Sequence, residues 1–364
     1  MSDWYFLTTP LAVLAVLLLF RFIGCTAFTA GENPTVETKL GPTGDPVADY
    51  PGTVLKDNPV SYWRLQEKHA AEPPTGPAVP APNTVTAGGT AKDEKGANNG
   101  TYKSVKVQPP APPPPPPPAP NLSDSPAAPG LLSLEAPGLL ELTGQQSTAL
   151  NVDGGYVEVP FSNSLLLNSF TIEALVRPDW DPNDPAESGR YRTVFAFNTI
   201  AVPPPPATPT AFGFGLFSGP VPGTASGSPV WQVWLGDGTT FKPIQDEATP
   251  DDPARPFTPV DFTKTNYLAV TYDAPTKKLN FYVYVRGIDL DSGVAHPVKD
   301  TTASYSPVTD STKSLLIGMH RPPVGSAMPV YHPFKGRIQE VAIYNKAMSI
   351  GSCPGTRVCA GLQL

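Results

Sequence analysis

Proline is the residue that most constrains how this chain can fold. The sequence contains 49 prolines among 364 residues, well over twice the usual share of about 5%. They occur in clusters, and the longest run places proline at every position from 112 to 118. A proline has no amide hydrogen to donate, so such a run can neither continue a helix nor pair inside a sheet. We therefore expect extended polyproline II insertions there, with packed structure confined to the stretches between them.

Those stretches contain short runs of β-branched and aromatic residues separated by turn residues. The clearest hairpin is "NYLAVTYDAPTKKLNFYVYVRG", residues 266–287, with its turn at 273–278. In its second half Leu279, Phe281, Val283 and Val285 fall on one face and Asn280, Tyr282, Tyr284 and Arg286 on the other, which is the period of a strand. We find no long amphipathic helical pattern. The sequence therefore predicts an all-β protein, an antiparallel two-sheet sandwich.

Charge argues against one class of partner. The formal net charge is −7, and no patch of Lys and Arg stands out in the sequence. Binding to nucleic acid needs such a patch to neutralise phosphates. We therefore expect no nucleic-acid partner and a location outside the cytoplasm.

The N-terminal segment predicts membrane targeting. Residues 4–20 are apolar and uncharged, and Arg21 and Cys25 follow them. This length lies at the lower limit of about 17 residues for crossing a bilayer. The segment can be a transmembrane anchor, a cleaved signal peptide, or a lipoprotein signal with lipidation at Cys25. Gly24 suits lipoprotein processing, whereas the bulky residues Phe22 and Ile23 before it do not. We therefore favour a transmembrane anchor with most of the chain outside the cytoplasm.

Two further cysteines lie near the C-terminus, in "SCPGTRVCAG". The Pro-Gly pair between Cys353 and Cys359 forms a turn that can bring the two thiols together. We predict a disulfide bond in an oxidising compartment, with two free thiols as the alternative. The tail offers too few ligands for a zinc site.

The order of the segments resembles a known family. "NPVSYWRLQE", "GANNGTY", "LNVDGGYVEVP", "SFTIEALVRP", the hairpin above, "SLLIGMH" and "FKGRIQEVAIYNKAMS" follow one another along the chain. This succession is similar to the LamG-like jellyroll domain of the concanavalin A-like lectin/glucanase superfamily. The resemblance implies two stacked antiparallel sheets, one of them concave, and a role as an adhesion or glycan-binding module.

This resemblance and the proline clusters together predict the domain boundaries. We expect a signal or transmembrane anchor at 1–25, a linker at 26–52, the jellyroll domain at 53–349 with proline-rich insertions at about 73–89, 108–130 and 202–209, and a tail at 350–364.

The last predicted strand carries one departure from the family. There the family commonly reads Gly-x-Ile-Asp-Glu-Val, and the resemblance implies that the Asp helps to hold a structural calcium ion. This chain has Gln339 at that position, after Gly336 as a turn residue. An amide supplies an oxygen without charge, so we expect the calcium site to be lost, although a carboxylate such as Asp57 or Glu67 could still help to hold an ion. Strand alternation places Glu340 on the opposite face, in an internal hydrogen bond or ion pair.

No catalytic pattern is present in the sequence. Glycosidases on this type of fold use paired carboxylates on one strand face, whereas Glu158 and Glu173 each stand alone. The four histidines, His69, His296, His320 and His332, have no recognisable nucleophile partner. We therefore expect no enzyme activity and no cofactor.

Aromatic residues are the candidates for ligand binding. Sugars stack on exposed rings, and Trp231, Trp234, Tyr282 and Tyr284 lie on predicted strands; the alternative is that they pack inside the protein. The predicted function is an envelope-anchored module that binds a glycan or another surface ligand. A purely structural surface protein and an atypical glycoside hydrolase are the alternatives.

Overall fold

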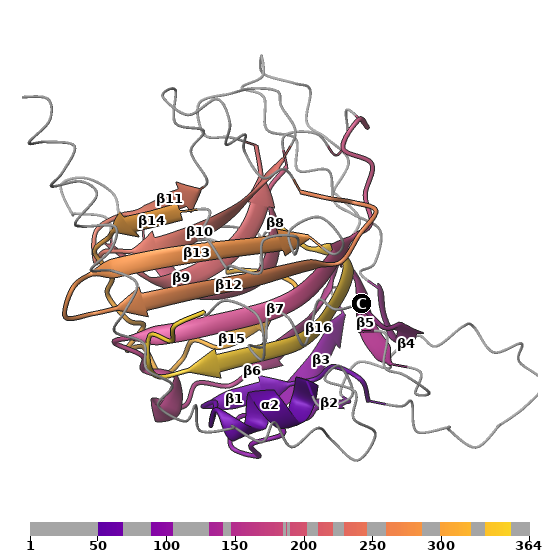
Figure 1. Ribbon diagram of the computed structural model, residues 1–364, viewed down its shortest axis with the longest axis horizontal. Helices are drawn as coiled ribbons and strands as arrows, with labels where there is room; N and C mark the ends of the chain where they lie inside the picture. The colour runs from indigo at the N-terminus through magenta and orange to yellow at the C-terminus, as the bar shows by residue number, and fades with distance from the viewer. Residues whose placement is uncertain are drawn as a thin grey trace, which may run out of the picture. The chain divides into compact units, whose positions relative to one another are not determined.

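The strands form two antiparallel sheets in a computed structural model of the protein (Figure 1). The structure describes residues 50–67, 89–104, 131–140, 147–184, 187, 190–201, 210–220, 229–245, 260–285, 299–321 and 332–350. All of them belong to one compact unit, Gly41–Leu364.

Each sheet contains eight strands. The first sheet has the order β14-β13-β12-β7-β16-β5-β4, and its eighth strand, β1, pairs with β16 outside this linear order. The second sheet has the order β11-β10-β9-β8-β15-β6-β3-β2. The strands are β1 (Ser61–Trp63), β2 (Thr90–Ala91), β3 (Gly100–Ser104), β4 (Leu131–Pro137), β5 (Thr148–Asp153), β6 (Gly155–Val159), β7 (Phe170–Pro178), β8 (Arg192–Ala201), β9 (Thr210–Gly219), β10 (Val230–Gly236), β11 (Phe241–Gln245), β12 (Asn266–Asp273), β13 (Lys278–Val285), β14 (Lys299–Thr302), β15 (Leu315–Ile317) and β16 (Lys335–Tyr344).

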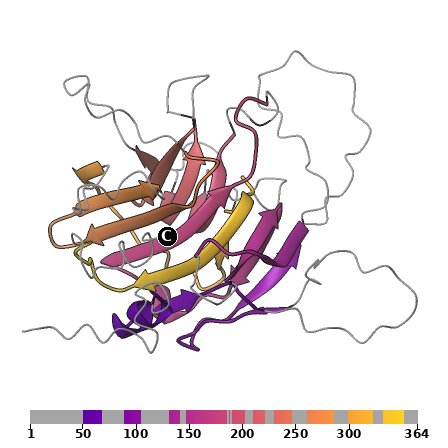
Figure 2. The same ribbon diagram turned by 45° about the vertical axis from the view of Figure 1, so that its right-hand side comes forward.

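The two sheets lie face to face around one hydrophobic core (Figure 2). Phe170 of β7 and Phe214 of β9 meet across the sandwich with ring centroids 5.2 Å apart. The side chains of Leu279, Phe281 and Val283 enter this core, as the alternation along β13 predicts. The predicted two-sheet antiparallel jellyroll sandwich is therefore confirmed.

A second hydrophobic cluster covers the outward face of the first sheet. A short helix, α2 (Tyr50–Lys56), lies beside β1 in Figure 1 and contributes Tyr50 and Val54 to it. The strands contribute a set of tyrosines, namely Tyr62, Tyr267, Tyr282, Tyr284 and Tyr344. This outward face is thus packed in its own right.

A bulge in β16 changes the expected direction of one side chain. The pairing with β7 shifts between Gln339 and Ala342, and Glu340 has a left-handed backbone with φ of 55°. A bulge inserts an extra residue and re-aims the side chains around it. Gln339 consequently donates to the Glu340 carboxylate at 3.2 Å, so the two side chains meet. The prediction that Glu340 points to the opposite face is wrong; its predicted internal hydrogen bonding and ion pair are confirmed, with Arg64 at 3.4 Å.

Gly336 also differs from its predicted role. It lies inside β16, where its φ is 137°, and a Cβ there would clash with the Arg177 carbonyl oxygen. Glycine is needed at this position because no side chain fits between the two strands.

Several predictions concern residues outside the described ranges. They are the apolar segment 4–20, Cys25, the cysteine pair Cys353 and Cys359, and the three proline-rich insertions. Within the ranges that the structure describes, no helix is both long and apolar enough to span a bilayer.

Candidate ligand-binding site

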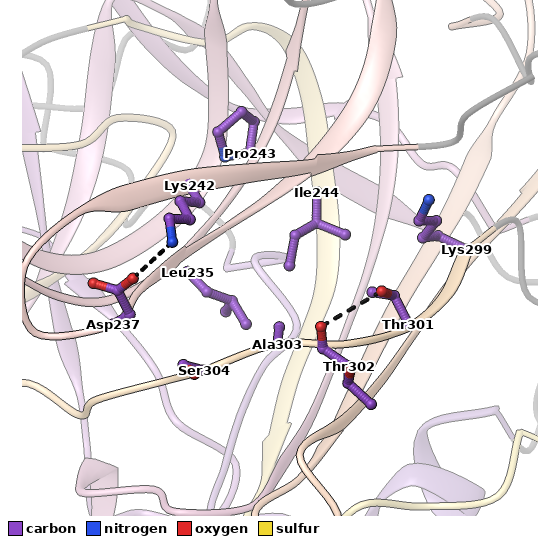
Figure 3. Close-up of a pocket in the computed structure, with 10 residues that line it drawn as sticks. All are labelled: Leu235, Asp237, Lys242, Pro243, Ile244, Lys299, Thr301, Thr302, Ala303 and Ser304. Atoms are coloured by element: carbon purple, nitrogen blue, oxygen red, sulfur yellow. Dashed lines mark hydrogen bonds and ion pairs between the residues drawn. The ribbon is translucent and has the colours of Figure 1, made fainter.

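A hollow of about 490 Å³ lies where one edge of each sheet meets the other (Figure 3). It is formed by the end of β10, the strand β11 and the segment that begins at β14, and β11 and β14 are the terminal strands of their sheets. Its volume falls within the range of about 300–1,000 Å³ that is usual for small-molecule pockets. The lining residues are Leu235, Asp237, Lys242, Pro243, Ile244, Lys299, Thr301, Thr302, Ala303 and Ser304.

Asp237 organises one end of this edge hollow. Its carboxylate accepts hydrogen bonds from the Thr240 amide at 2.8 Å and from the Thr239 amide and hydroxyl at 2.9 and 2.7 Å. It also forms an ion pair with the Lys242 ammonium at 3.0 Å. The backbone hydrogen bond from Thr240, aided by those of Thr239 and Lys242, holds the pKa of this carboxyl well below its usual range. An ionised carboxylate beside an ammonium group therefore has a fixed place at this end.

The opposite wall supplies hydroxyl groups and a second ammonium group. Thr301, Thr302 and Ser304 come from β14 and the residues after it, and Figure 3 shows Lys299 on this side, away from Lys242. The Ala303 amide donates to the Lys277 carbonyl at 2.9 Å, which ties this wall to the β12–β13 turn. Leu235 and Ile244 reach the hollow from the core side of the second sheet. The result is a polar rim around a small apolar floor.

The structure separates the four predicted aromatic residues. Trp231 is 1% exposed in the core, where its indole N–H donates to Asn266 Oδ1 at 3.1 Å. Its assignment to a binding site is therefore corrected, because the ring has no accessible face. Trp234 lies on the other face of the same strand and is half-buried. Tyr282 and Tyr284 lie side by side on the first sheet with centroids 6.4 Å apart, and both are buried.

The residues of the edge hollow were missed by the sequence reasoning. Except for Leu235, they belong to two Thr-containing segments, "GDGTTFKPI" at 236–244 and "KDTTAS" at 299–304. Each reads as an ordinary turn or edge strand. The two segments form one site only because the edges of the two sheets lie together, and no sequence pattern predicts that contact.

Both polar atoms of the Gln339 side-chain amide form hydrogen bonds within the protein. Its Oε1 accepts from the Leu139 amide at 2.6 Å, and its Nε2 donates to Ser147 Oγ at 2.9 Å. Asp57 follows the end of α2, and the Glu67 carboxylate accepts from the Lys92 amide and the Tyr102 hydroxyl. Among the described residues, no three or more His, Cys, Asp or Glu side chains gather closely enough to hold a metal ion. The predicted loss of calcium stays a prediction.

The two isolated glutamates lie on different sheets. Glu173 of β7 accepts from the hydroxyls of Tyr267 at 2.5 Å and Tyr344 at 2.7 Å. Glu158 of β6 accepts from Arg321 at 3.0 Å and Ser314 at 2.9 Å. Since β7 and β6 belong to opposite layers of the sandwich, these two carboxylates do not form the pair that glycoside hydrolysis uses.

Comparisons with known proteins identify no family. No family model and no curated protein sequence matches the chain. Similar solved structures include a native heptameric SAP-like pentraxin from Limulus polyphemus, at 8% identity and a TM-score of 0.30, covering 50% of this chain and 66% of the pentraxin. They also include the IT-sialidase CBM40 of Ruminococcus gnavus bound to α2,3-sialyllactose, at 12% identity and a TM-score of 0.30, covering 50% of this chain and 79% of that one.

A third similar structure is the exoplasmic/lumenal domain of VIP36 in its Ca²⁺/Man2-bound form. It matches at 10% identity with a TM-score of 0.32, covering 57% of this chain and 75% of that domain. At these low scores the similarities support no functional assignment, and the resemblance to LamG-like domains remains a prediction.

Proposed function

We propose that this chain is a non-enzymatic glycan-binding module, held at the cell envelope by its N-terminal segment. The observation that carries the proposal is the edge hollow, which combines oriented polar groups with a small apolar floor in a volume of about 490 Å³.

The chemistry of the hollow suits a sugar. A pyranose presents hydroxyl groups that both donate and accept hydrogen bonds, together with apolar C–H faces. The lysine ammonium groups supply donors, and the hydroxyls of Thr301 and Thr302 supply both donors and acceptors. Leu235 and Ile244 supply apolar contact on the floor. Pockets with a few convergent polar groups on an apolar base are the usual form of a small-molecule site.

The charge arrangement supports binding over hydrolysis. Retaining and inverting glycosidases need two carboxyl groups about 5–9.5 Å apart, one of them protonated. Asp237 is the one carboxylate among the ten lining residues, and the donors of its own turn keep its pKa low. Its two oxygens already accept from Thr239, Thr240 and Lys242, and it is unsuited to donate a proton.

A glycan array tests this function on the full-length chain in detergent. We expect binding to at least one neutral glycan. Thr302→Trp, which places a large ring in the exposed rim of the hollow, should reduce the affinity by about tenfold or more, or about 1.4 kcal/mol. Thr90→Trp is the matched surface control, since Thr90 is exposed on β2 at the other end of the second sheet.

Two results would count against the proposal. One is an array without any binding by correctly folded protein. The other is a neutral glycan that binds Thr302→Trp as tightly as it binds the wild type.

A further inference from the structure

The edge strand β11 presents one face to the edge hollow and the other to the outside of the second sheet. Lys242 pairs with Leu235, a residue of the core between the sheets, so its side chain lies on the hollow side. Pro243 follows it and pairs with Trp234, and it lies on the outward side because successive side chains of a strand alternate. Figure 3 shows Lys242 and Pro243 on opposite sides of the β11 ribbon, yet both line the hollow. The wall of the hollow therefore continues around the outer edge of β11 to the outward face of the sheet.

Two aromatic rings adjoin Pro243 on that outward face. Paired residues of an antiparallel ladder have Cβ atoms about 5 Å apart, which places Trp234 next to Pro243. Phe241 lies on the same face of β11, and its ring centroid is 5.6 Å from that of Trp234. Pro243 is exposed, Trp234 and Phe241 are half-buried, and neither ring belongs to the core between the sheets. We call these three residues the outward platform.

The Trp234 ring is held firmly from within the protein. Its indole N–H donates to Gln232 Oε1 at 3.0 Å, and Gln232 Nε2 donates to the Pro220 carbonyl at 2.7 Å. The rings of Tyr191 and Phe217 each lie 5.4 Å from it between centroids. A side chain that is already fixed loses little conformational entropy when a ligand binds to it. The ring can therefore serve as a rigid contact surface.

The residues at this edge favour a neutral sugar over an added peptide strand. Pro243 has no amide hydrogen to donate, and Lys242 beside it is exposed and charged. Proline and lysine protect the edge strand of a sheet from pairing with another chain. The three platform residues carry no ionisable group, so they offer contact to an apolar surface without selecting a charge. A pyranose whose substituents are all equatorial has such a surface, because its C–H bonds form two flat faces.

We propose that the edge hollow and the outward platform are one extended site, which takes a chain of equatorially linked neutral sugars. One sugar lies in the hollow, and the next crosses the β11 edge at Pro243 and stacks on the Trp234 ring. The separation of about 5 Å between paired Cβ atoms is comparable with the length of one sugar unit. The inference rests on the proposed function, and it adds the class of glycan and a minimum length of two sugars.

The test compares the binding of glucose, cellobiose and maltose to the full-length chain in detergent by ligand-observed NMR titration. Cellobiose is equatorially linked, so its second sugar can reach the platform. It should bind about tenfold more tightly than glucose, which is the order of effect of one aromatic anchor in an interface. Maltose has the same composition, but its axial bond bends the second sugar away, so it should bind no more tightly than glucose.

Variants assign the expected gain to the outward platform. Trp234→Ala should reduce the affinity for cellobiose to about that of the wild type for glucose. Tyr156→Ala is the matched control and should leave the cellobiose affinity unchanged, because Tyr156 is also half-buried outside the core but lies on β6, away from β11 in the strand order. If Trp234→Ala does not fold, Phe241→Ala takes its place and should also weaken cellobiose binding.

Three results would overturn the inference. Cellobiose could bind the wild type no more tightly than glucose, maltose could bind as tightly as cellobiose, or a folded platform variant could keep the full affinity for cellobiose. Each of these is distinct from a failure of the proposed function, which an array without any bound glycan would show. Neutral glycans bound on the array without any binding of cellobiose would reject the extended site and leave the proposed function standing.

Discussion

Glu340 shows how one residue can satisfy a local pattern and still defeat a sequence prediction. Strand alternation predicted that its side chain points to the face opposite Gln339. A bulge, which no residue type in the sequence indicates, turns it toward Gln339 instead. Its fully buried carboxylate accepts from Gln66 at 2.6 Å and also contacts Tyr62 and Arg64. Burial raises the pKa of this carboxyl above its ordinary value, against the opposing effect of Arg64 and of the hydrogen-bond donors around it.

This raised pKa predicts a specific dependence of stability on pH. The folded state keeps a proton that the unfolded chain releases near the ordinary pKa of 4.5. The free energy of unfolding should therefore fall as the pH rises from that value to the folded pKa, by up to about 1.4 kcal/mol per pH unit. Glu340→Gln should remove this part of the slope, so its stability relative to the wild type rises with pH. Urea unfolding over this pH range measures this dependence, with Glu94→Gln, at a partly exposed glutamate, as the control. Parallel curves for Glu340→Gln and wild type would contradict the prediction.

The two tryptophans of β10 provide a second test at the level of residues. Trp231 fills the core, whereas Trp234 lies on the outward face. Trp231→Ala should lower the free energy of unfolding by about 3–5 kcal/mol, the usual effect of removing a large core ring. Trp234→Ala should lower it by about 1 kcal/mol. Chemical denaturation of both variants makes the comparison, and equal losses would show that the assignment of faces is wrong.

At the level of elements, local patterns predicted the strands but not their neighbours. The β12–β13 hairpin was predictable, because its turn and its alternating faces are encoded within 22 successive residues. The position of β16 between β7 and β5 was not, because it depends on contacts between segments far apart in the chain. The edge hollow was missed for the same reason, since β11 and β14 belong to different sheets.

Gly336 tests the close packing of β16 against β7. Gly336→Ala must adopt a φ of 137° and also clash with the Arg177 carbonyl. Gly96→Ala is the matched control, because Gly96 has a φ of 80° but no neighbouring atom lies within 4 Å of the position that a Cβ would take. We expect a loss of about 1 kcal/mol for Gly96→Ala from backbone strain alone. A larger loss is expected for Gly336→Ala, and equal urea midpoints would show that the clash is relieved.

For the whole molecule, composition predicted that packed structure is confined to the stretches between the proline clusters. Every strand and helix that the structure describes falls between residues 50 and 344. The resemblance to LamG-like domains and the absence of a catalytic pattern led to the prediction of a binding module, but neither could identify the ligand. Recognition of a ligand depends on the geometry of a few side chains, and a single sequence contains no measure of that geometry.

The N-terminal segment predicts that the whole protein associates with a membrane. Residues 4–20 are apolar and uncharged, so the full-length protein should sediment with membranes. Deletion of 4–20 should move it to the soluble fraction without changing its melting temperature. Recovery of the intact protein from the cytosol as freely soluble material would reject the anchor, the lipoprotein and the envelope location together.

The central position of β16 also has a consequence for synthesis. β16 is the last strand that the structure describes, yet it lies between β7 and β5 and also pairs with β1. While the ribosome is still translating the preceding 334 residues, those three strands lack their common partner and present open edges that invite pairing with other chains. At about 5–20 residues per second, this exposure lasts for many seconds. The first sheet can therefore be completed only after β16 has been translated, and a chain terminated before residue 335 should aggregate.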